Sequence, residues 1–414
     1  MAISFRKPGI VPSSNVYPRD IPPLVENLRR FIGADELNRR MQEYRKRQAV
    51  SDGIGVVRLR ERQAVLDGFK DYRKQTLGGN RPLRSVTREV ALLTSVAGLC
   101  QTIAPTLRGG IERHHRDRLV NLDGQLPPLL LEWAMASFYV RKYGAELAWF
   151  EASETGPELV AHADGLEWEL ECKRLTPMIT ELLGDAEADK LASSVMRVIK
   201  SAGHHGEFAL AFPPSREPLT AGDLDLIETE VRANISHGDV DLVLLGDIAF
   251  TGVSSVTDGK PMEADAWRAQ LELSKQPDAR LYAVAGASSG RAVNPITLQL
   301  SASRRSPPDL LHYLWERKFR TAASQCTSRR GAVLAFEWSG IDDPSVFADS
   351  EGMQDLMKRT FAEFRHVAVI VMRCGTALVH EVSGFKMDTN AYVARSEVSD
   401  FPQIAALKHL DDSQ

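Results

Sequence analysis

The sequence predicts an α/β protein whose N-terminal part is helical and basic. Three observations support this. Up to about residue 122, apolar side chains recur at spacings of four or five, as on one face of a helix; Leu24, Leu28, Ile32, Leu37 and Met41 are the first of them. After that point, short β-branched runs alternate with helical ones, which is typical of layered α/β structures. Charge is also distributed unevenly along the chain.

The formal net charge of −4 hides this asymmetry. Residues 1–120 hold 23 Lys+Arg and 12 Asp+Glu, a balance of +11, so the other residues hold 28 against 43, or −15. A basic segment of this size suggests an acidic partner such as nucleic acid. The alternative is a solvated helical surface, because several of these arginines follow acids at ion-pair spacing.

The elements follow in order from these patterns. The first twenty residues are rich in Pro, Ser and Gly and are expected to be extended. Expected helices are Pro23–Val50, Val56–Thr76, Ser85–Thr106, Pro128–Tyr143, Ala186–Ala202, Leu224–Ile235, Pro308–Cys326 and Met353–Phe364. Expected strands are Ala145–Glu151, Glu158–His162, Glu167–Leu175, Glu207–Phe212, Val240–Leu245, Arg280–Ala287, Val293–Leu300, Ala332–Trp338, Val367–Arg373 and Ala377–Val382.

Several classes of protein are disfavoured. No stretch approaches about 20 consecutive apolar residues, so no transmembrane helix is expected. The N-terminus lacks the pattern of a secretory signal. Cys100, Cys172, Cys326 and Cys374 are far apart and form no CxxC pair, which predicts neither disulfides nor a cysteine zinc site and favours the cytoplasm. His114-His115 and His204-His205 are adjacent pairs that cannot face one metal, and we expect them at the surface or at helix ends.

A hairpin with unusual charges is predicted around Asp164-Gly165, because Asp-Gly between two alternating runs is typical of a two-residue turn. In that register Glu158 lies opposite Glu171, and Lys173 shares a face with Glu171. Two opposed carboxylates repel each other unless a cation lies between them. Carboxylate oxygens suit Mg²⁺ or Mn²⁺ rather than zinc. The alternative is that Glu167, Glu169, Glu171 and Lys173 form a solvated strand face opposite Trp168, Leu170 and Cys172.

Glu132 is the one acid in the helix Pro128–Tyr143, and its neighbours at three and four positions are apolar. A carboxylate on an apolar face is costly to bury without a cation or a hydrogen-bond partner. Service as a further metal ligand, direct or through water, would account for it.

The order of these features resembles the PD-(D/E)XK nuclease superfamily, which has the restriction-endonuclease-like fold. The resemblance covers about residues 123–250. In that family a helix carries an acid, a hairpin carries an Asp and an (Asp/Glu)-x-Lys, and a further helix leads to a parallel strand. By position Glu158 and Glu171 match the two metal-binding acids, Lys173 the lysine and Glu132 the helical acid. Pro157-Glu158 replaces the usual Pro-Asp. The helix Ala186–Ala202 and the strand Glu207–Phe212 would then be the continuation.

The resemblance implies a restriction-endonuclease-like mixed sheet flanked by helices. Its core would span 123–250, after a basic helical region at 1–122 and before an α/β extension at 251–414. It also implies a Mg²⁺- or Mn²⁺-dependent nuclease of restriction or bacterial-defence type. Glu132, Glu158, Glu171 and Lys173 would form the catalytic site, and Glu158, Glu171, Glu132 and the backbone carbonyl of Cys172 would bind the metal.

We expect nucleic acid to bind the basic 1–120 region, with DNA favoured and RNA left open. A homodimer or an activating partner protein is also compatible with the sequence, whereas a membrane partner is not expected. The competing hypothesis is a catalytically inactive scaffold of the same fold, or a nucleic-acid-binding subunit, in which the change from Asp to Glu has abolished activity.

Overall fold

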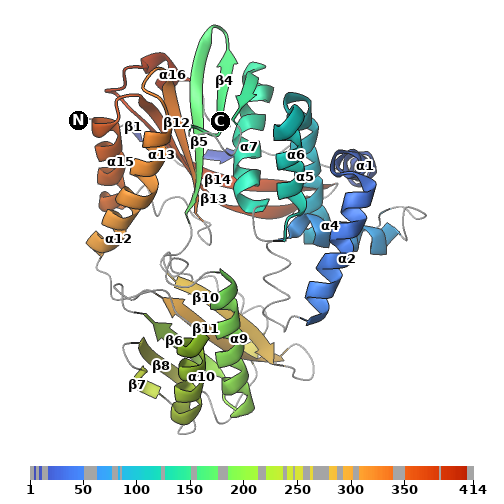
Figure 1. Ribbon diagram of the computed structural model, residues 1–414, viewed down its shortest axis with the longest axis vertical. Helices are drawn as coiled ribbons and strands as arrows, with labels where there is room; N and C mark the ends of the chain where they lie inside the picture. Colours follow the sequence, from blue (N-terminus) through green and yellow to red (C-terminus); the bar gives the residue numbers. More distant parts are fainter. Residues whose placement is uncertain are drawn as a thin grey trace. The chain divides into compact units, whose positions relative to one another are not determined.

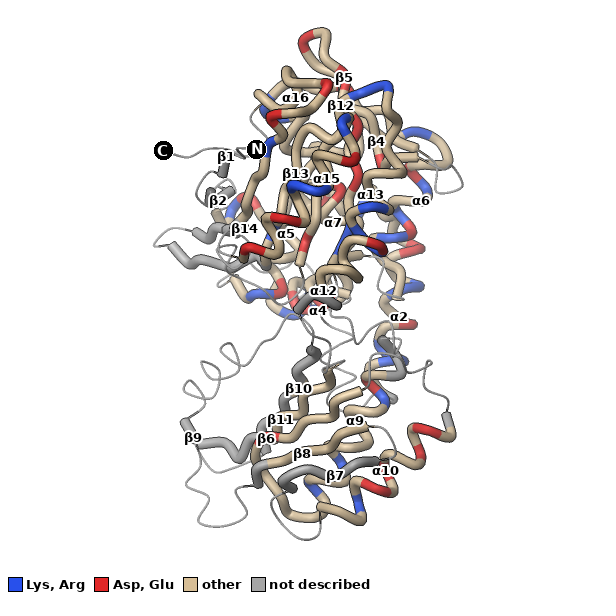
Figure 2. The backbone as a smooth tube through the Cα atoms, turned by 90° about the vertical axis from the view of Figure 1, so that its left-hand side faces the viewer, with Lys and Arg blue, Asp and Glu red and all other residues tan. Residues whose placement is uncertain are grey.

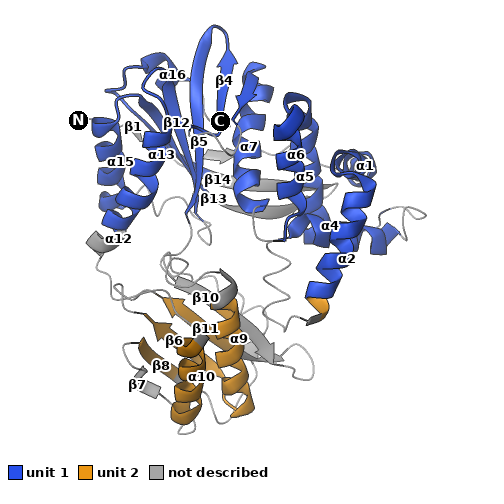
Figure 3. Ribbon diagram, viewed as in Figure 1, with its two compact units in different colours: residues 1–47, 59–175, 311–414 blue, residues 48–58, 176–310 orange. Residues whose placement is uncertain are grey.

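A computed structural model shows the α/β architecture that the sequence predicts, built on two mixed sheets (Figure 1). It describes residues 4–5, 9–11, 17–50, 63–76, 83, 86–122, 126–150, 156–175, 185–212, 221–235, 240–245, 248–254, 262–263, 279–286, 292–301, 307–338, 350–381 and 384–407. The chain divides into two compact units (Figure 3). Unit 1 comprises Met1–Arg47, Leu59–Leu175 and Leu311–Gln414, and unit 2 comprises Gln48–Arg58 and Thr176–Leu310.

The N-terminal part of unit 1 is helical, as predicted. Its helices are α1 (Ile21–Ile32), α2 (Ala34–Val50), α4 (Ala64–Thr76), α5 (Arg88–Ile103) and α6 (Gly109–Val120). The expected single helix from Pro23 to Val50 is two helices, because Gly33 adopts a φ of 91° between them. Short strands β1 (Ser4–Phe5) and β2 (Gly9–Val11) precede the helices. Both pair with β14, a C-terminal strand, and neither this strand nor the pairing was predicted from the sequence.

The sheet of unit 1 has the order β1-β14-β13-β12-β5-β4-β3, with β2 also on β14. Its other strands are β3 (Glu146–Trp149), β4 (Leu159–Ala163), β5 (Leu166–Leu175), β12 (Gly331–Trp338), β13 (Val367–Glu381) and β14 (Gly384–Arg395). Strand β12 runs parallel to both β5 and β13, and the remaining pairs are antiparallel.

Helices cover both faces of this sheet (Figure 1). On one face lies α7 (Leu126–Tyr143), whose Tyr139 packs edge-to-face on Trp168 of β5 at 5.1 Å between ring centroids. On the other lies a continuous helical segment made of α12 (Pro307–Leu314), the π-helical turn η3 (Trp315–Phe319) and α13 (Arg320–Gln325). Its Phe319 stacks on Phe336 of β12 at 4.3 Å. The helix α15 (Glu351–Glu363) packs against this segment, and the short α16 (Pro402–Ala406) contacts β13.

The predicted hairpin is confirmed in its turn and its register. Asp164 and Gly165 have φ values of 52° and 76°, the left-handed pair that a type I′ turn requires. Leu159 pairs with Leu170 and Ala163 with Leu166, the register expected from the sequence. The alternation of β5 therefore places Glu169, Glu171 and Lys173 on the face under α13, and Trp168, Leu170 and Cys172 on the face under α7.

The expected continuation of this core is wrong. Helix α9 (Asp185–Ser201) and strand β6 (Gly206–Ala211) form where a helix and a strand were predicted, but β6 pairs with β11 and β8 instead of β5. The strand parallel to β5 is β12, which follows α13. The boundaries 123–250 and 251–414 therefore differ from the observed division: 126–175 and 311–407 share one sheet. The sequence suggested β6 as the parallel neighbour of β5 because β6 is the next suitable strand along the chain. In the structure unit 2 is inserted between β5 and its actual neighbour, β12.

Unit 2 is a second α/β layer structure. Its sheet has the order β10-β11-β6-β8-β7, with β9 on β11. Besides β6, the strands are β7 (Val240–Leu245), β8 (Ile248–Ser254), β9 (Met262–Glu263), β10 (Ala279–Gly286) and β11 (Ala292–Ser301). Helices α9 and α10 (Ala221–Ile235) pack on the sheet around a core that includes Phe208, Leu210, Phe250 and Leu298.

The sequence predicted neither disulfides nor a transmembrane helix. All four cysteines are buried free thiols. In the part of the chain that the structure describes, no helix combines the length and apolar character needed to cross a membrane.

Candidate functional site

The candidate site is built on the open end of the β4–β5 hairpin. Glu158 immediately precedes β4, its side chain is half-buried, and its backbone N–H donates to the Leu170 carbonyl at 3.0 Å. Glu171 lies in β5 at the next position of the same register and is 1% exposed. Lys173 follows on the same face. The hairpin thus brings together the two acids and the lysine that the sequence predicted.

Glu171 is a buried carboxylate with little compensation. Its Oε1 forms a close ion pair with Lys173 Nζ, and neither oxygen accepts a hydrogen bond from any other group among the described residues. Burial raises the pKa of Glu171 to about 8, and the nearby charge of Glu158 adds to this, while Lys173 opposes it. For Lys173, burial lowers the pKa, but Glu171 outweighs that effect and the net shift is upward.

The alternative of a solvated strand face is wrong for two of its four members. Glu169 and Glu171 are 0% and 1% exposed, whereas Glu167 is exposed. Glu169 is well satisfied: it accepts hydrogen bonds from the backbone N–H and the hydroxyl of Thr327, and it forms an ion pair with Arg330 at 3.5 Å. Two neighbouring buried glutamates on one face therefore differ sharply, and Glu171 alone of the two lacks a hydrogen bond.

Glu132 is buried on α7 at 3% exposure, as its apolar neighbours predicted. The structure gives it a different cation from the expected metal: Arg118 of α6 donates to both carboxylate oxygens, at 2.8 and 2.6 Å. Since the guanidinium engages both oxygens, Glu132 is not free to act as a direct metal ligand in this arrangement. Burial and the charge of Glu158 raise the pKa of Glu132 to about 7 against the opposing effect of Arg118.

Arg118 is a residue that sequence reasoning missed. It lies 14 positions before Glu132 in a helix, Gly109–Val120, with no clear apolar periodicity. Its side chain is 13% exposed and it interacts electrostatically with Glu132, Glu158 and Cys172. Only the contact between α6 and α7 reveals it, so no local pattern could have identified it.

His115 does not lie at the surface as expected. It is 3% exposed, its Nδ1 accepts a hydrogen bond from the Trp133 indole at 2.9 Å, and its ring packs against Trp149 at 4.7 Å. Burial, followed by the charge of Arg118, lowers the pKa of His115 to about 3. It is a neutral core histidine.

A divalent metal at this site would need ligands from the residues described above. Among the described residues there is no group of three or more His, Cys, Asp or Glu side chains that could hold an ion. A metal would therefore have to use the smaller donor set that the sequence predicted: Glu158, Glu171 and the backbone carbonyl of Cys172. The buried, unbonded oxygens of Glu171 fit that assignment, because an oxygen-ligating cation would supply the missing compensation.

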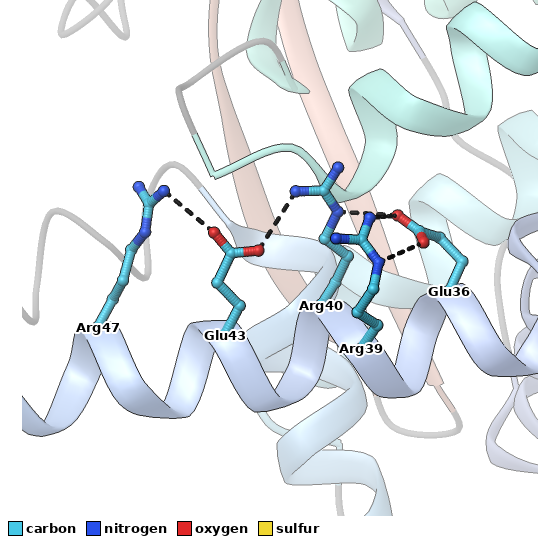
Figure 4. A network of polar contacts seen from close by, with 5 residues as sticks. All are labelled: Glu36, Arg39, Arg40, Glu43 and Arg47. Carbon is cyan, nitrogen blue, oxygen red and sulfur yellow. Dashed lines mark hydrogen bonds and ion pairs between the residues drawn. The ribbon is translucent and has the colours of Figure 1, made fainter.

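Part of the positive charge of the basic helical region is neutralised by its own acids. Along α2, Glu36 binds Arg39 and Arg40, and Glu43 binds Arg40 and Arg47, at separations of three and four residues (Figure 4). Hydrogen bonding from Arg39 lowers the pKa of Glu36. Figure 2 shows the same alternation of basic and acidic positions along α2 and α6. The arrangement matches the ion-pair alternative, and nucleic-acid binding by this region stays a prediction.

Comparison with known proteins found no matching family model, no matching curated protein and no matching solved structure.

Proposed function

We propose that this protein is a metal-dependent nuclease whose site is centred on Glu171. The observation that carries the proposal is the state of this side chain. It is a fully buried carboxylate without a hydrogen bond, beside a second acid and a lysine. Strongly perturbed groups of this kind are concentrated at functional sites.

The order of elements in unit 1 supports the same proposal. An acid-bearing helix (α7), a hairpin with the two acids and the lysine, and a helix that leads to a strand parallel to β5 follow one another, as in the PD-(D/E)XK nucleases. The helix and strand are α13 and β12, and unit 2 is inserted before them. The restriction-endonuclease-like assignment rests on this order together with the residues of the hairpin.

The roles follow from the positions. Glu158, Glu171 and the Cys172 carbonyl would hold Mg²⁺ or Mn²⁺, which supplies a Lewis acid and an acidified water when bound. Lys173 would stabilise negative charge that develops on the phosphate, or orient the attacking water. Arg118 and Glu132 lock each other in position beside these groups. The substrate would be nucleic acid, DNA in preference to RNA.

A specific observation favours the competing proposal of an inactive scaffold. Lys173 already neutralises Glu171, Arg118 already neutralises Glu132, and glutamate stands at position 158 where the family usually has aspartate. A chain in which two of the three acids have acquired a side-chain cation could keep the fold without the metal.

Cleavage of plasmid DNA, linear DNA and RNA with Mg²⁺ or Mn²⁺ tests the two proposals. Lys173→Ala and Glu171→Ala should each lower the rate by about 10²–10⁴-fold. Glu167→Ala is the matched control, since Glu167 is an exposed acid on the same strand face. Cleavage that survives both site substitutions would exclude the site. Absence of cleavage, with intact salt-sensitive binding of DNA, would favour the scaffold.

A further inference from the structure

A row of charged side chains crosses the sheet of unit 1 beside the candidate site. Glu337 of β12 pairs with Arg174 of β5 on one side and with Arg373 of β13 on the other. Because these strands are parallel, paired residues project from the same face. Arg174 lies two positions after Cys172, so the row is on the face that α7 covers, at the carboxyl ends of β5 and β12.

Arg373 is the buried member of this row. It is 8% exposed, and its Nη1 has no hydrogen-bond partner. Among the described residues no ion pair with Arg373 is formed; Glu337 instead lies 4.0 Å from Arg174. On its other side, Arg373 is paired with Ala391 of β14, whose methyl group offers no acceptor. The row therefore holds two guanidinium groups and one carboxylate.

A guanidinium is always charged, and burying it without an anion is costly. The position of Arg373 therefore calls for an anionic group from outside the described residues. Planar guanidinium groups pair with phosphate through two parallel hydrogen bonds, which makes phosphate the anion of best geometric fit.

Two neighbouring features favour an anion here. Helix α7 runs from Leu126 to Tyr143. The charge of Glu132, in its N-terminal half, acts on Cys172, and the ring of Tyr143, at its C-terminal end, lies 6.4 Å from that of Trp168. Its N-terminal end, which carries a partial positive charge, is therefore at the same end of β5 as the row. In addition, the pairing of β13 with β14 shifts register directly after Arg373, and such irregularities often occur beside functional sites.

The row lies at the carboxyl ends of β5 and β12, on the face of the sheet opposite Glu171 and Lys173. Burial raises the pKa of the Cys172 thiol, and the charges of Glu132, Glu158 and Glu171 add to this, whereas Arg373 opposes it. Arg373 is thus within electrostatic reach of the residue whose carbonyl would contact the metal.

We propose that Arg373, flanked by Arg174, forms a phosphate-binding subsite for the backbone of the nucleic acid. This proposal rests on the proposed nuclease function, and it assigns Arg373 to substrate binding rather than to the chemical step.

Arg373→Met tests the subsite, with Arg365→Met as the control. Arg365 precedes β13, is exposed and forms an ion pair with Asp400. Two measurements apply: thermal unfolding in inorganic phosphate against chloride at equal ionic strength, and fluorescence anisotropy of a labelled DNA duplex in EDTA. Wild type and Arg365→Met should gain stability from phosphate. Arg373→Met should lose that gain, bind the duplex about tenfold more weakly, and show a shallower salt dependence.

Unchanged duplex affinity in Arg373→Met would overturn the proposal, as would the absence of phosphate-specific stabilisation in wild type. If Arg373→Met does not fold, Glu337→Gln decides: removal of the acid from the row should tighten phosphate binding, and an unchanged affinity refutes the subsite. The two proposals fail separately. Phosphate binding through Arg373 without any cleavage would leave the subsite standing and the nuclease refuted, and cleavage with normal binding by Arg373→Met would do the reverse.

Discussion

Glu171→Gln should stabilise the metal-free protein, an unusual result for a buried residue. The folded state keeps a proton on Glu171 that the unfolded chain releases, because the pKa is raised from 4.5 to about 8. The contribution of Glu171 to stability therefore falls as pH rises from about 4.5 to about 8 and is level above that. At about 1.4 kcal/mol per pKa unit, the ionised carboxylate costs about 5 kcal/mol at pH 9 but only about 1 kcal/mol at pH 5. Glutamine mimics the neutral form and removes this cost.

Urea unfolding followed by tryptophan fluorescence, in EDTA at pH 5, 7 and 9, measures the effect. The signal comes mainly from unit 1, which contains five of the six tryptophans: Trp133, Trp149, Trp168, Trp315 and Trp338. Glu169→Gln is the matched control. Glu169 is equally buried on the same face, but it accepts two hydrogen bonds from Thr327, so its substitution should destabilise the protein by about 2–4 kcal/mol.

At pH 9 we expect Glu171→Gln to stabilise the protein and Glu169→Gln to destabilise it. If Glu171→Gln destabilised the protein as much as Glu169→Gln does, Glu171 would be a structural ion held by Lys173. The argument that it is kept for function at the expense of stability would then be refuted.

Three further substitutions test other parts of the structure. Arg118→Met should cost about 3–5 kcal/mol because it leaves the buried Glu132 carboxyl without its cation and hydrogen-bond donor, and adding Glu132→Gln should restore most of that loss in urea unfolding; an equally unstable double variant would contradict the pairing. His115 has a pKa lowered from 6.5 to about 3, so its own contribution to stability falls by about 1.4 kcal/mol per pH unit between pH 6.5 and 3. The difference in stability between wild type and His115→Gln should change by that amount between pH 6 and 4, and a difference that does not depend on pH would be evidence against a neutral core histidine. Gly165→Ala should cost about 1–2 kcal/mol of stability in the same assay. The cost comes from the φ of 76° alone, because no atom lies within 4 Å of the added methyl group, and an unaltered stability would argue against the type I′ turn.

Features that depend on interactions between residues close in sequence were predicted correctly, and features that depend on long-range contacts were not. The hairpin register was predictable because Asp164-Gly165 sets the turn locally, and the positions of Glu158, Glu171 and Lys173 depend on that register. The burial of Glu132 was predictable from its apolar helical neighbours. Its partner Arg118 was not, because the contact joins two helices whose relative packing no short-range pattern encodes.

Strand pairing over long distances was the other limit. Alternation along the chain indicated β5 and β12 as strands, yet 155 residues separate the end of β5 at Leu175 from the start of β12 at Gly331, with all of unit 2's sheet between them. The nearest suitable strand in sequence, β6, has its own partners. Arg373 shows the same limit, since it ends an apolar run and resembles an ordinary exposed strand terminus until β12 and β14 lie on either side of it.

Local physical chemistry thus decided the helices, the β4–β5 hairpin and the face on which each of its acids lies, because turn geometry and side-chain alternation act over a few residues. Tertiary structure alone decided which of those acids are compensated. Thr327 satisfies Glu169, Arg118 satisfies Glu132, and Glu171 is left with an ion pair and no hydrogen bond. Desolvation depends on everything that packs around a group, and that environment is assembled from segments far apart in the chain.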